Sequence, residues 1–138
     1  MIAEQSVAPV SGVTTGFRYA VVAFAWLIAL GSMIQVFLIG LYLFEADGGY
    51  LSDHTDFGHM IGLLAYLLSI LALIGRISRQ LVGHAVAVTI IYIVQIILPT
   101  IDQGWIAALH PVNAFLVIGS AASLGRNTLE LIQAKNRV

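Results

Sequence analysis

Histidine is the residue type through which this sequence could do chemistry. The chain contains four histidines and no cysteine, so disulfide bonds, thiolate–metal sites and cysteine nucleophiles are excluded. His59 and His110 each stand near the start of a long apolar run without Asp, Glu, Lys or Arg. Because an ionisable side chain inside a membrane is energetically costly, we treat both residues as functional candidates.

Two neutral imidazoles that face each other across a helix bundle can supply both axial ligands of a haem iron. We expect His59 and His110 to bind one b-type haem in this way. Asp56, one turn before His59, is placed to hold the other ring nitrogen of that histidine. Small or polar side chains on the same helix faces are expected to line the pocket: Gln35, Tyr66, Gln95 and Asn113. The alternative is that both histidines only make structural hydrogen bonds.

The other two histidines are expected to have different roles. His54 lies in an acidic stretch with Asp53 and Asp56. We expect a solvated loop there, with one of the carboxylates capping the following helix; a hard-cation or copper site is the alternative. His84 follows a basic turn and is expected to lie at the membrane interface rather than to bind a second cofactor.

The elements that must position these residues are membrane-spanning helices. The chain is 59% hydrophobic and only 9% charged, whereas about a quarter of the residues in a soluble domain are charged. A spanning helix needs about 20 mostly apolar residues. Four stretches without acidic or basic residues meet this need: Tyr19–Phe44, Phe57–Gly75, Leu81–Ile101 and Gln103–Gly125.

Short connections between the four stretches predict an all-α, up-down-up-down four-helix bundle in a lipid bilayer. We expect a polar tail over residues 1–18 and a transmembrane domain over 19–126. Its spans are expected at about 19–44, 57–75, 81–101 and 105–125, and a second tail over 127–138.

The charged residues predict the orientation of the bundle. All six basic residues fall on one side of the expected membrane: Arg18, Arg76, Arg79, Arg126, Lys135 and Arg137. The positive-inside rule then places both termini in the cytoplasm, at the inner membrane. The net charge of −1 argues against nucleic acid as a partner.

A weak internal repeat relates the two halves of the chain. QVFLIGL begins at Gln35 and QIILPTI begins at Gln95, and each is followed by a histidine and a Gly-Arg pair. Two tandem helical hairpins related by an axis along the membrane normal would place His59 opposite His110. The alternative is chance similarity between apolar segments.

The stretches HMIGLLAYLLSILAL, IIYIVQIILP and LHPVNAFLVIGSAASLGR resemble one four-helix half of the haem A synthase family. They are also similar to small uncharacterised four-helix bacterial membrane proteins. The resemblance covers about Gln35 to Arg126 and implies haem ligation by His59 and His110. The chain matches one half of that family and lacks its cysteine pair, so the resemblance implies the scaffold and a b-type haem, not haem A synthesis.

We therefore expect a small membrane cytochrome with one bis-histidine haem near the outer face. It would transfer electrons to quinone or within a larger membrane complex, as a carrier or subunit and not as a stand-alone enzyme. The rival hypothesis is a cofactor-free accessory or assembly subunit, and both hypotheses allow other membrane subunits or a homodimer as partners. A small transporter is disfavoured because no charged residue lies mid-membrane.

Overall fold

The computed structural model describes residues 12–45 and 47–135, and these residues form an all-helical bundle without a strand. Its elements are α1 (Gly12–Glu45), α2 (Gly48–Ile74), α3 (Arg79–Ile97), η1 (Leu98–Thr100), α4 (Gly104–Ala107) and α5 (Leu109–Lys135). The four long helices are long and apolar enough to cross a membrane. The chain is thus a multi-pass membrane protein, as its composition predicts.

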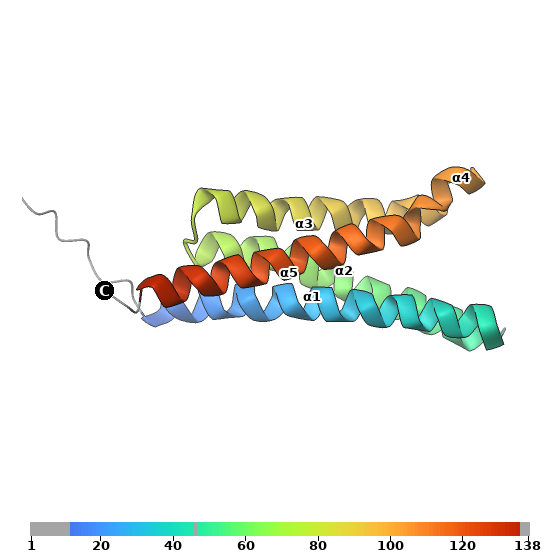
Figure 1. Cartoon of the computed structure of the whole chain (residues 1–138), viewed down its shortest axis with the longest axis horizontal. Helices are drawn as coiled ribbons and strands as arrows, with labels where there is room; N and C mark the ends of the chain where they lie inside the picture. The colour runs from blue at the N-terminus through green and yellow to red at the C-terminus, as the bar shows by residue number, and fades with distance from the viewer. Residues whose placement is uncertain (1–11, 46, 136–138) are drawn as a thin grey trace, which may run out of the picture.

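The four long helices form two antiparallel hairpins, α1–α2 and α3–α5, as Figure 1 shows. Each helix packs against two others: α1 against α2 and α5, and α3 against α2 and α5. The predicted up-down-up-down four-helix bundle is confirmed. The segment expected as a second tail is helical up to Lys135, and residues 1–11 of the expected first tail lie outside the described residues.

The second helix begins earlier than the apolar run predicts. Asp47 caps α2, and its carboxylate accepts a hydrogen bond of 2.9 Å from the Gly49 amide. The expectation of a loop around His54, capped by Asp53 or Asp56, is therefore wrong. A helix needs lipid-compatible side chains only within the bilayer, so α2 extends past its apolar run while both aspartates stay exposed to water.

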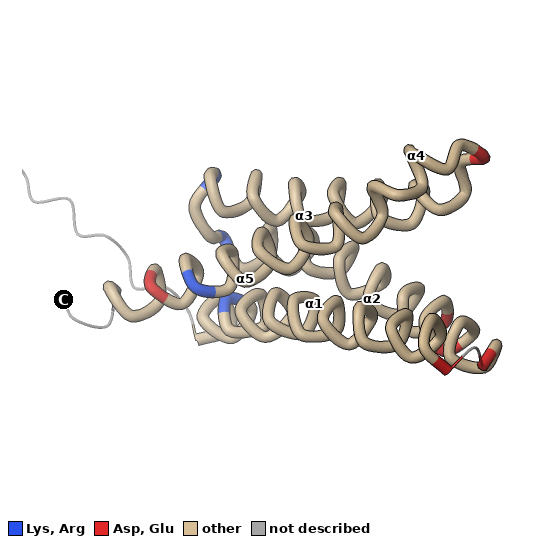
Figure 2. Tube along the Cα trace, turned by 45° about the vertical axis from the view of Figure 1, so that its right-hand side comes forward, with Lys and Arg blue, Asp and Glu red and all other residues tan. Residues whose placement is uncertain are grey.

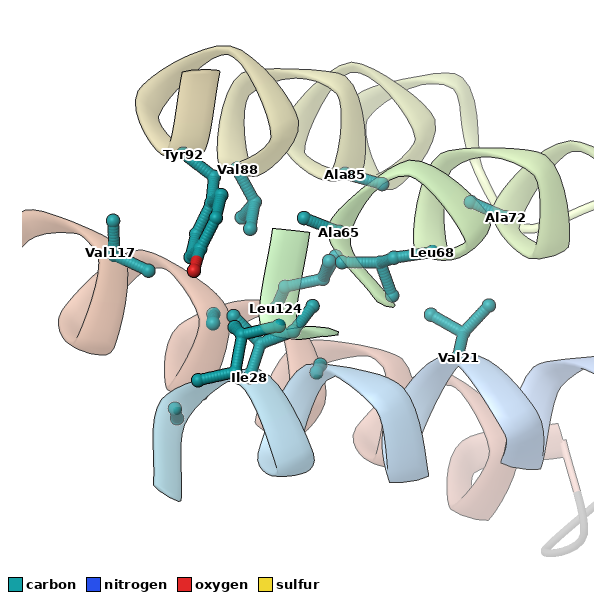
Figure 3. Packing of buried hydrophobic residues seen from close by; sticks show 14 of the residues in the cluster. Val21, Ile28, Ala65, Leu68, Ala72, Ala85, Val88, Tyr92, Val117 and Leu124 are labelled. Carbon is teal, nitrogen blue, oxygen red and sulfur yellow. The ribbon is translucent and has the colours of Figure 1, made fainter. Parts of the chain in front are cut away.

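The core is a column of small and branched side chains contributed by all four long helices (Figure 3). The buried residues follow one another at three- or four-residue spacing, which places them on one face of each helix. They include Val21, Ala25 and Ile28 of α1, Ile61, Ala65 and Leu68 of α2, Ala85, Val88 and Tyr92 of α3, and Val117, Ala121 and Leu124 of α5. The remaining faces expose large apolar side chains, as expected for contact with lipid.

The buried positions reveal the register of the internal repeat. In four pairs of buried residues, the member in α5 follows the member in α2 by the same number of residues. These pairs are Ile61 and Val117, Ala65 and Ala121, Leu68 and Leu124, and Ala72 and Thr128. A second constant spacing relates buried pairs of α1 and α3: Ala25 and Ala85, Ile28 and Val88, and Ser32 and Tyr92. The same two spacings pair Gln35 with Gln95, and His54 with His110.

The predicted register, which paired His59 with His110, is therefore wrong. That prediction aligned the two Gly-Arg pairs, which occupy different positions in the two hairpins. Gly75 follows the end of α2, whereas Gly125 lies inside α5, which continues to Lys135. The two hairpins therefore correspond in the helix faces that they bury, and not in the positions where their helices end.

The two ends of the bundle differ in charge. Among the described residues, Lys and Arg lie toward the end that holds the α2–α3 turn, here called the basic end (Figure 2). All described acidic residues except Glu130 lie toward the opposite end, here called the acidic end. The acidic end holds the α1–α2 connection and the segment η1–α4.

Candidate functional site

A cavity of about 290 Å³ lies between the two hairpins toward the acidic end, where they diverge in the views of Figures 1 and 2. Residues of α1, α2, α3, η1 and α5 line it. The polar side chains among them are Ser32, Gln35, His54, Thr55, His59, Tyr92, Gln95 and His110. Three of the four histidines of the chain therefore reach one cavity.

His54 is held by the first hairpin in a defined tautomer. Its Nδ1 lies 3.1 Å from the main-chain oxygen of Gln35. A carbonyl oxygen only accepts hydrogen bonds, so the proton resides on Nδ1 and the lone pair on Nε2. Within residues 12–45 and 47–135, Nε2 of His54 has no hydrogen-bond partner. This nitrogen is an unpaired hydrogen-bond acceptor at the cavity.

His110 is held in the same way by the second hairpin. Its Nδ1 donates to the main-chain oxygen of Gln95 at 2.8 Å. Its Nε2 lies 3.2 Å from Nε2 of the Gln95 side-chain amide, which donates to it. The Gln95 Oε1 in turn accepts a bond of 2.7 Å from Asn113 Nδ2, which also donates to the Ile91 carbonyl at 3.0 Å. Both ring nitrogens of His110 are thus occupied.

The two imidazoles form a pair across the interface between the hairpins. The ring centroids of His54 and His110 are 6.0 Å apart, and the ring planes are inclined by 67°. Each ring receives its orientation from the main chain of the equivalent glutamine, Gln35 or Gln95. The repeat of the fold is therefore also a repeat of the site.

Tyr92 and Gly58 close the cavity on the side of the core. The Tyr92 hydroxyl donates to the Gly58 carbonyl at 2.6 Å and links α3 to α2. A Cβ atom at Gly58 would lie 2.8 Å from Nε2 of Gln35, so glycine leaves the space that the glutamine side chain occupies. The Gln35 Oε1 is buried and has no hydrogen-bond partner among the described residues.

The structure brings together some of the residues predicted from sequence and separates others. Gln35, Gln95 and His110 line the cavity. Asn113 donates a hydrogen bond to the side chain of Gln95. His59 also lines the cavity but is exposed and makes no hydrogen bond within the described ranges.

Tyr66 and Asp56 lie away from this site. Tyr66 is 46% exposed and does not contribute to the cavity lining. Asp56 is exposed and lies with Asp53 at a separate shallow hollow on the surface. In the part of the chain that the structure describes, Asp56 makes no hydrogen bond to His59.

The sequence-based prediction did not place His54 in the cavity, although a signal for this position exists. His54, Gly58, Ile61 and Ala65 continue one stripe along α2 with helical spacing. His110, Ala114, Val117 and Ala121 form the equivalent stripe along α5. Extending the buried stripe beyond the apolar run would have identified the pair.

Two further polar contacts join the helices nearer the basic end. His84 Nε2 lies 3.1 Å from the Ser120 hydroxyl, which links α3 to α5. The Thr89 hydroxyl donates to the Ala65 carbonyl at 2.6 Å and lies 2.8 Å from the Ser69 hydroxyl, which links α3 to α2. The side chains of His84, Thr89 and Ser69 are thereby satisfied by neighbouring helices.

Residues 35–101 of the chain match a family of unknown function (DUF6220). The matched segment begins at Gln35 in the cavity wall and contains α2, α3 and η1, including His54 and Gln95. No curated protein and no solved structure matches the chain. The resemblance to the haem A synthase family therefore receives no support from these comparisons.

Proposed function

We propose that this protein is a small membrane cytochrome that holds one b-type haem between its two hairpins. The observation that carries the proposal is the pairing of His54 and His110 at equivalent positions of an internal repeat, with both rings oriented by main-chain carbonyls. A haem held by two histidines would supply one-electron transfer.

The distance between the two rings suits a shared metal ion. With metal–nitrogen bonds of about 2 Å, two imidazoles on opposite sides of one ion have ring centres roughly 6 Å apart. The observed separation is 6.0 Å. A hydrogen bond from Nδ1 to a carbonyl is also the usual support of a metal-binding histidine, because it fixes the tautomer and raises the basicity of Nε2.

The volume and the lining of the cavity support a ligand site. Its volume of about 290 Å³ is close to the lower end of the range for ligand sites, roughly 300 Å³. It is bounded by apolar side chains such as Ile39, Leu51 and Ile96 together with the polar groups described above.

We propose that His54 and His110 would hold the haem iron, in preference to the pair His59 and His110 that the sequence predicts. Nε2 of His54 is unpaired and its ring is fixed, whereas the exposed ring of His59 has no support from the described residues. His59 remains in the cavity wall, and replacing it tests the sequence-based assignment directly.

We further propose that both termini face the cytoplasm, which places the haem near the outer face of the inner membrane. The support for this orientation is the concentration of Lys and Arg toward one end of the bundle (Figure 2). Quinone dissolved in the surrounding lipid, or the further subunits of a membrane complex, would then be the partners for electron exchange.

A cofactor-free accessory subunit is the second candidate function. The observation that favours it is the hydrogen bonding of His110, since Gln95 satisfies both nitrogens of that ring without any cofactor. In this hypothesis the histidine pair would serve only to fasten the two hairpins together.

An absorption spectrum of the full chain distinguishes the two candidates. The protein is purified in mild detergent from a haem-sufficient host and reduced with dithionite. A Soret band with sharp α and β bands is expected, and it is expected to disappear in His54→Ala and His110→Ala but to persist in His59→Ala. His84→Ala is the matched control, because this histidine lies outside the cavity and bonds to Ser120.

Two results would oppose the proposal in different ways. Colourless, correctly folded protein from that host would reject the haem and favour the accessory subunit. Loss of the spectrum in His59→Ala, with retention in His54→Ala, would reject our assignment of the ligands in favour of the pair predicted from sequence.

A further inference from the structure

We infer that the side chains of Gln95 and Asn113, here called the amide pair, hold His110 in an inactive state and thereby control when this histidine can bind a metal. The inference rests on the haem site proposed above and assigns regulation of that site to one of its two hairpins. It follows from a difference between two otherwise equivalent histidines.

The amide pair has only one hydrogen-bonding arrangement that satisfies all its members. Nδ2 of Asn113 donates to the Ile91 carbonyl and to Oε1 of Gln95. Because Oε1 must face this donor, the amide nitrogen of Gln95 faces Nε2 of His110. Asn113 is only 9% exposed, so a reversed Gln95 amide would oppose two donors in a poorly solvated place.

The first hairpin lacks this arrangement. Gln35 supports His54 through its main-chain oxygen, as Gln95 supports His110. However, the position equivalent to Asn113 is Phe57, whose ring offers no amide donor. Oε1 of Gln35 accordingly has no partner among the described residues. Nε2 of His54 is left available, whereas Nε2 of His110 is covered.

The consequence is an ordered use of the two ligands. Nε2 of His54 would be open to a metal ion directly, whereas Nε2 of His110 would become open only after Gln95 withdraws its amide. Removing one neutral hydrogen bond of ordinary strength should change an equilibrium constant by roughly 2- to 12-fold. The amide pair should therefore weaken and delay haem binding by about this factor. While the cavity is empty, the Gln95 amide keeps Nε2 of His110 hydrogen-bonded.

Gln95→Ala tests the inference with little disturbance of the ring. The substitution removes the side-chain amide but keeps the main-chain oxygen that accepts from Nδ1 of His110. Haemin is titrated into the full-length protein, purified without haem in detergent, and the dissociation constant and association rate are measured. Gln95→Ala should bind roughly 2- to 12-fold more tightly and associate faster. Gln80→Ala, which removes an exposed amide of the same helix outside the cavity lining, should bind as the unmodified protein does.

Asn113→Ala provides an independent test that leaves Gln95 in place. It frees Oε1 of Gln95, so the amide can rotate and release His110. A shift in the same direction as Gln95→Ala supports the inference. Unchanged or weaker haemin binding in both variants, at unchanged helix content, would overturn it.

A spectroscopic measurement separates failure of this inference from failure of the haem proposal. In haem-free protein labelled with ¹⁵N at histidine, the Nε2 resonance of His110 should move in Gln95→Ala, while that of His54 should not. If His110 Nε2 does not move, the amide pair does not hold it and the inference is wrong. If it moves and no variant binds haemin, the hold on His110 is real, but the proposed function and the control of metal binding inferred from it are both wrong.

Discussion

Arg18→Met should destabilise the bundle by removing a contact at the basic end. Arg18 is 8% exposed. Its Nε donates to the Gly75 carbonyl at 3.0 Å, and its Nη2 donates to the Arg76 carbonyl at 3.0 Å. These carbonyls belong to the end of α2 and the turn to α3, where Arg76 has a φ of 47°. Arg18 of α1 thus donates to main-chain carbonyls at the end of α2, which have no donor within that helix.

The magnitude follows from the burial of the two bonds. Hydrogen bonds to charged groups contribute about 1.5–3 kcal/mol, and ordinary ones about 0.5–1.5 kcal/mol. The Nε bond is buried and is counted as charged, whereas the Nη2 bond is partly buried and is counted as ordinary. Their loss should lower the free energy of unfolding by roughly 2–4.5 kcal/mol. Methionine retains most of the apolar stem, so lost packing adds little.

The measurement is an unfolding titration with sodium dodecyl sulfate in mixed micelles, followed by circular dichroism. Arg79→Met is the matched control, because Arg79 is exposed and makes no side-chain hydrogen bond among the described residues. The control should stay within about 0.5 kcal/mol of the unmodified protein. Equal free energies of unfolding for the two variants would refute the assignment of Arg18 as the support of the turn.

Two further predictions concern packing and orientation. A Cβ atom at Gly62 would lie 3.1 Å from Cε1 of Tyr92, whose hydroxyl is held by an α2 carbonyl at 2.6 Å. Gly62→Ala should therefore cost roughly 1–3 kcal/mol in the same titration, and Gly119→Ala, with no atom within 4 Å, should cost nothing; equal costs would contradict this account. Because the chain has no cysteine, Asp102→Cys and Arg79→Cys can each carry the only thiol. A membrane-impermeant maleimide added to intact cells should label the first and not the second, and the reverse pattern would invert the proposed topology.

The charge-free stretches were sufficient to predict the four long helices, but not the short η1 and α4. Within lipid, main-chain groups find no water, so an apolar stretch of this length has to be helical. His110 does make structural hydrogen bonds, which were the sequence-based alternative to haem ligation, and Gln95 supplies both partners. Gln95 precedes the α3–α5 connection and His110 follows it, so a short connection of antiparallel helices brings them together.

The amino-acid sequence by itself determined the membrane environment, the four spans and the residue types available to the site, because these depend on composition and local hydrogen bonding. Only the tertiary structure decided which histidine faces His110. That choice depends on where α2 begins and on which faces of α2 and α5, marked by Ala65 and Ala121, are buried in the core. Hydrated side chains let a helix extend beyond its apolar run, and packing between side chains sets the rotation of the helix about its axis. Neither the first residue of a helix nor its rotation can therefore be read from hydropathy.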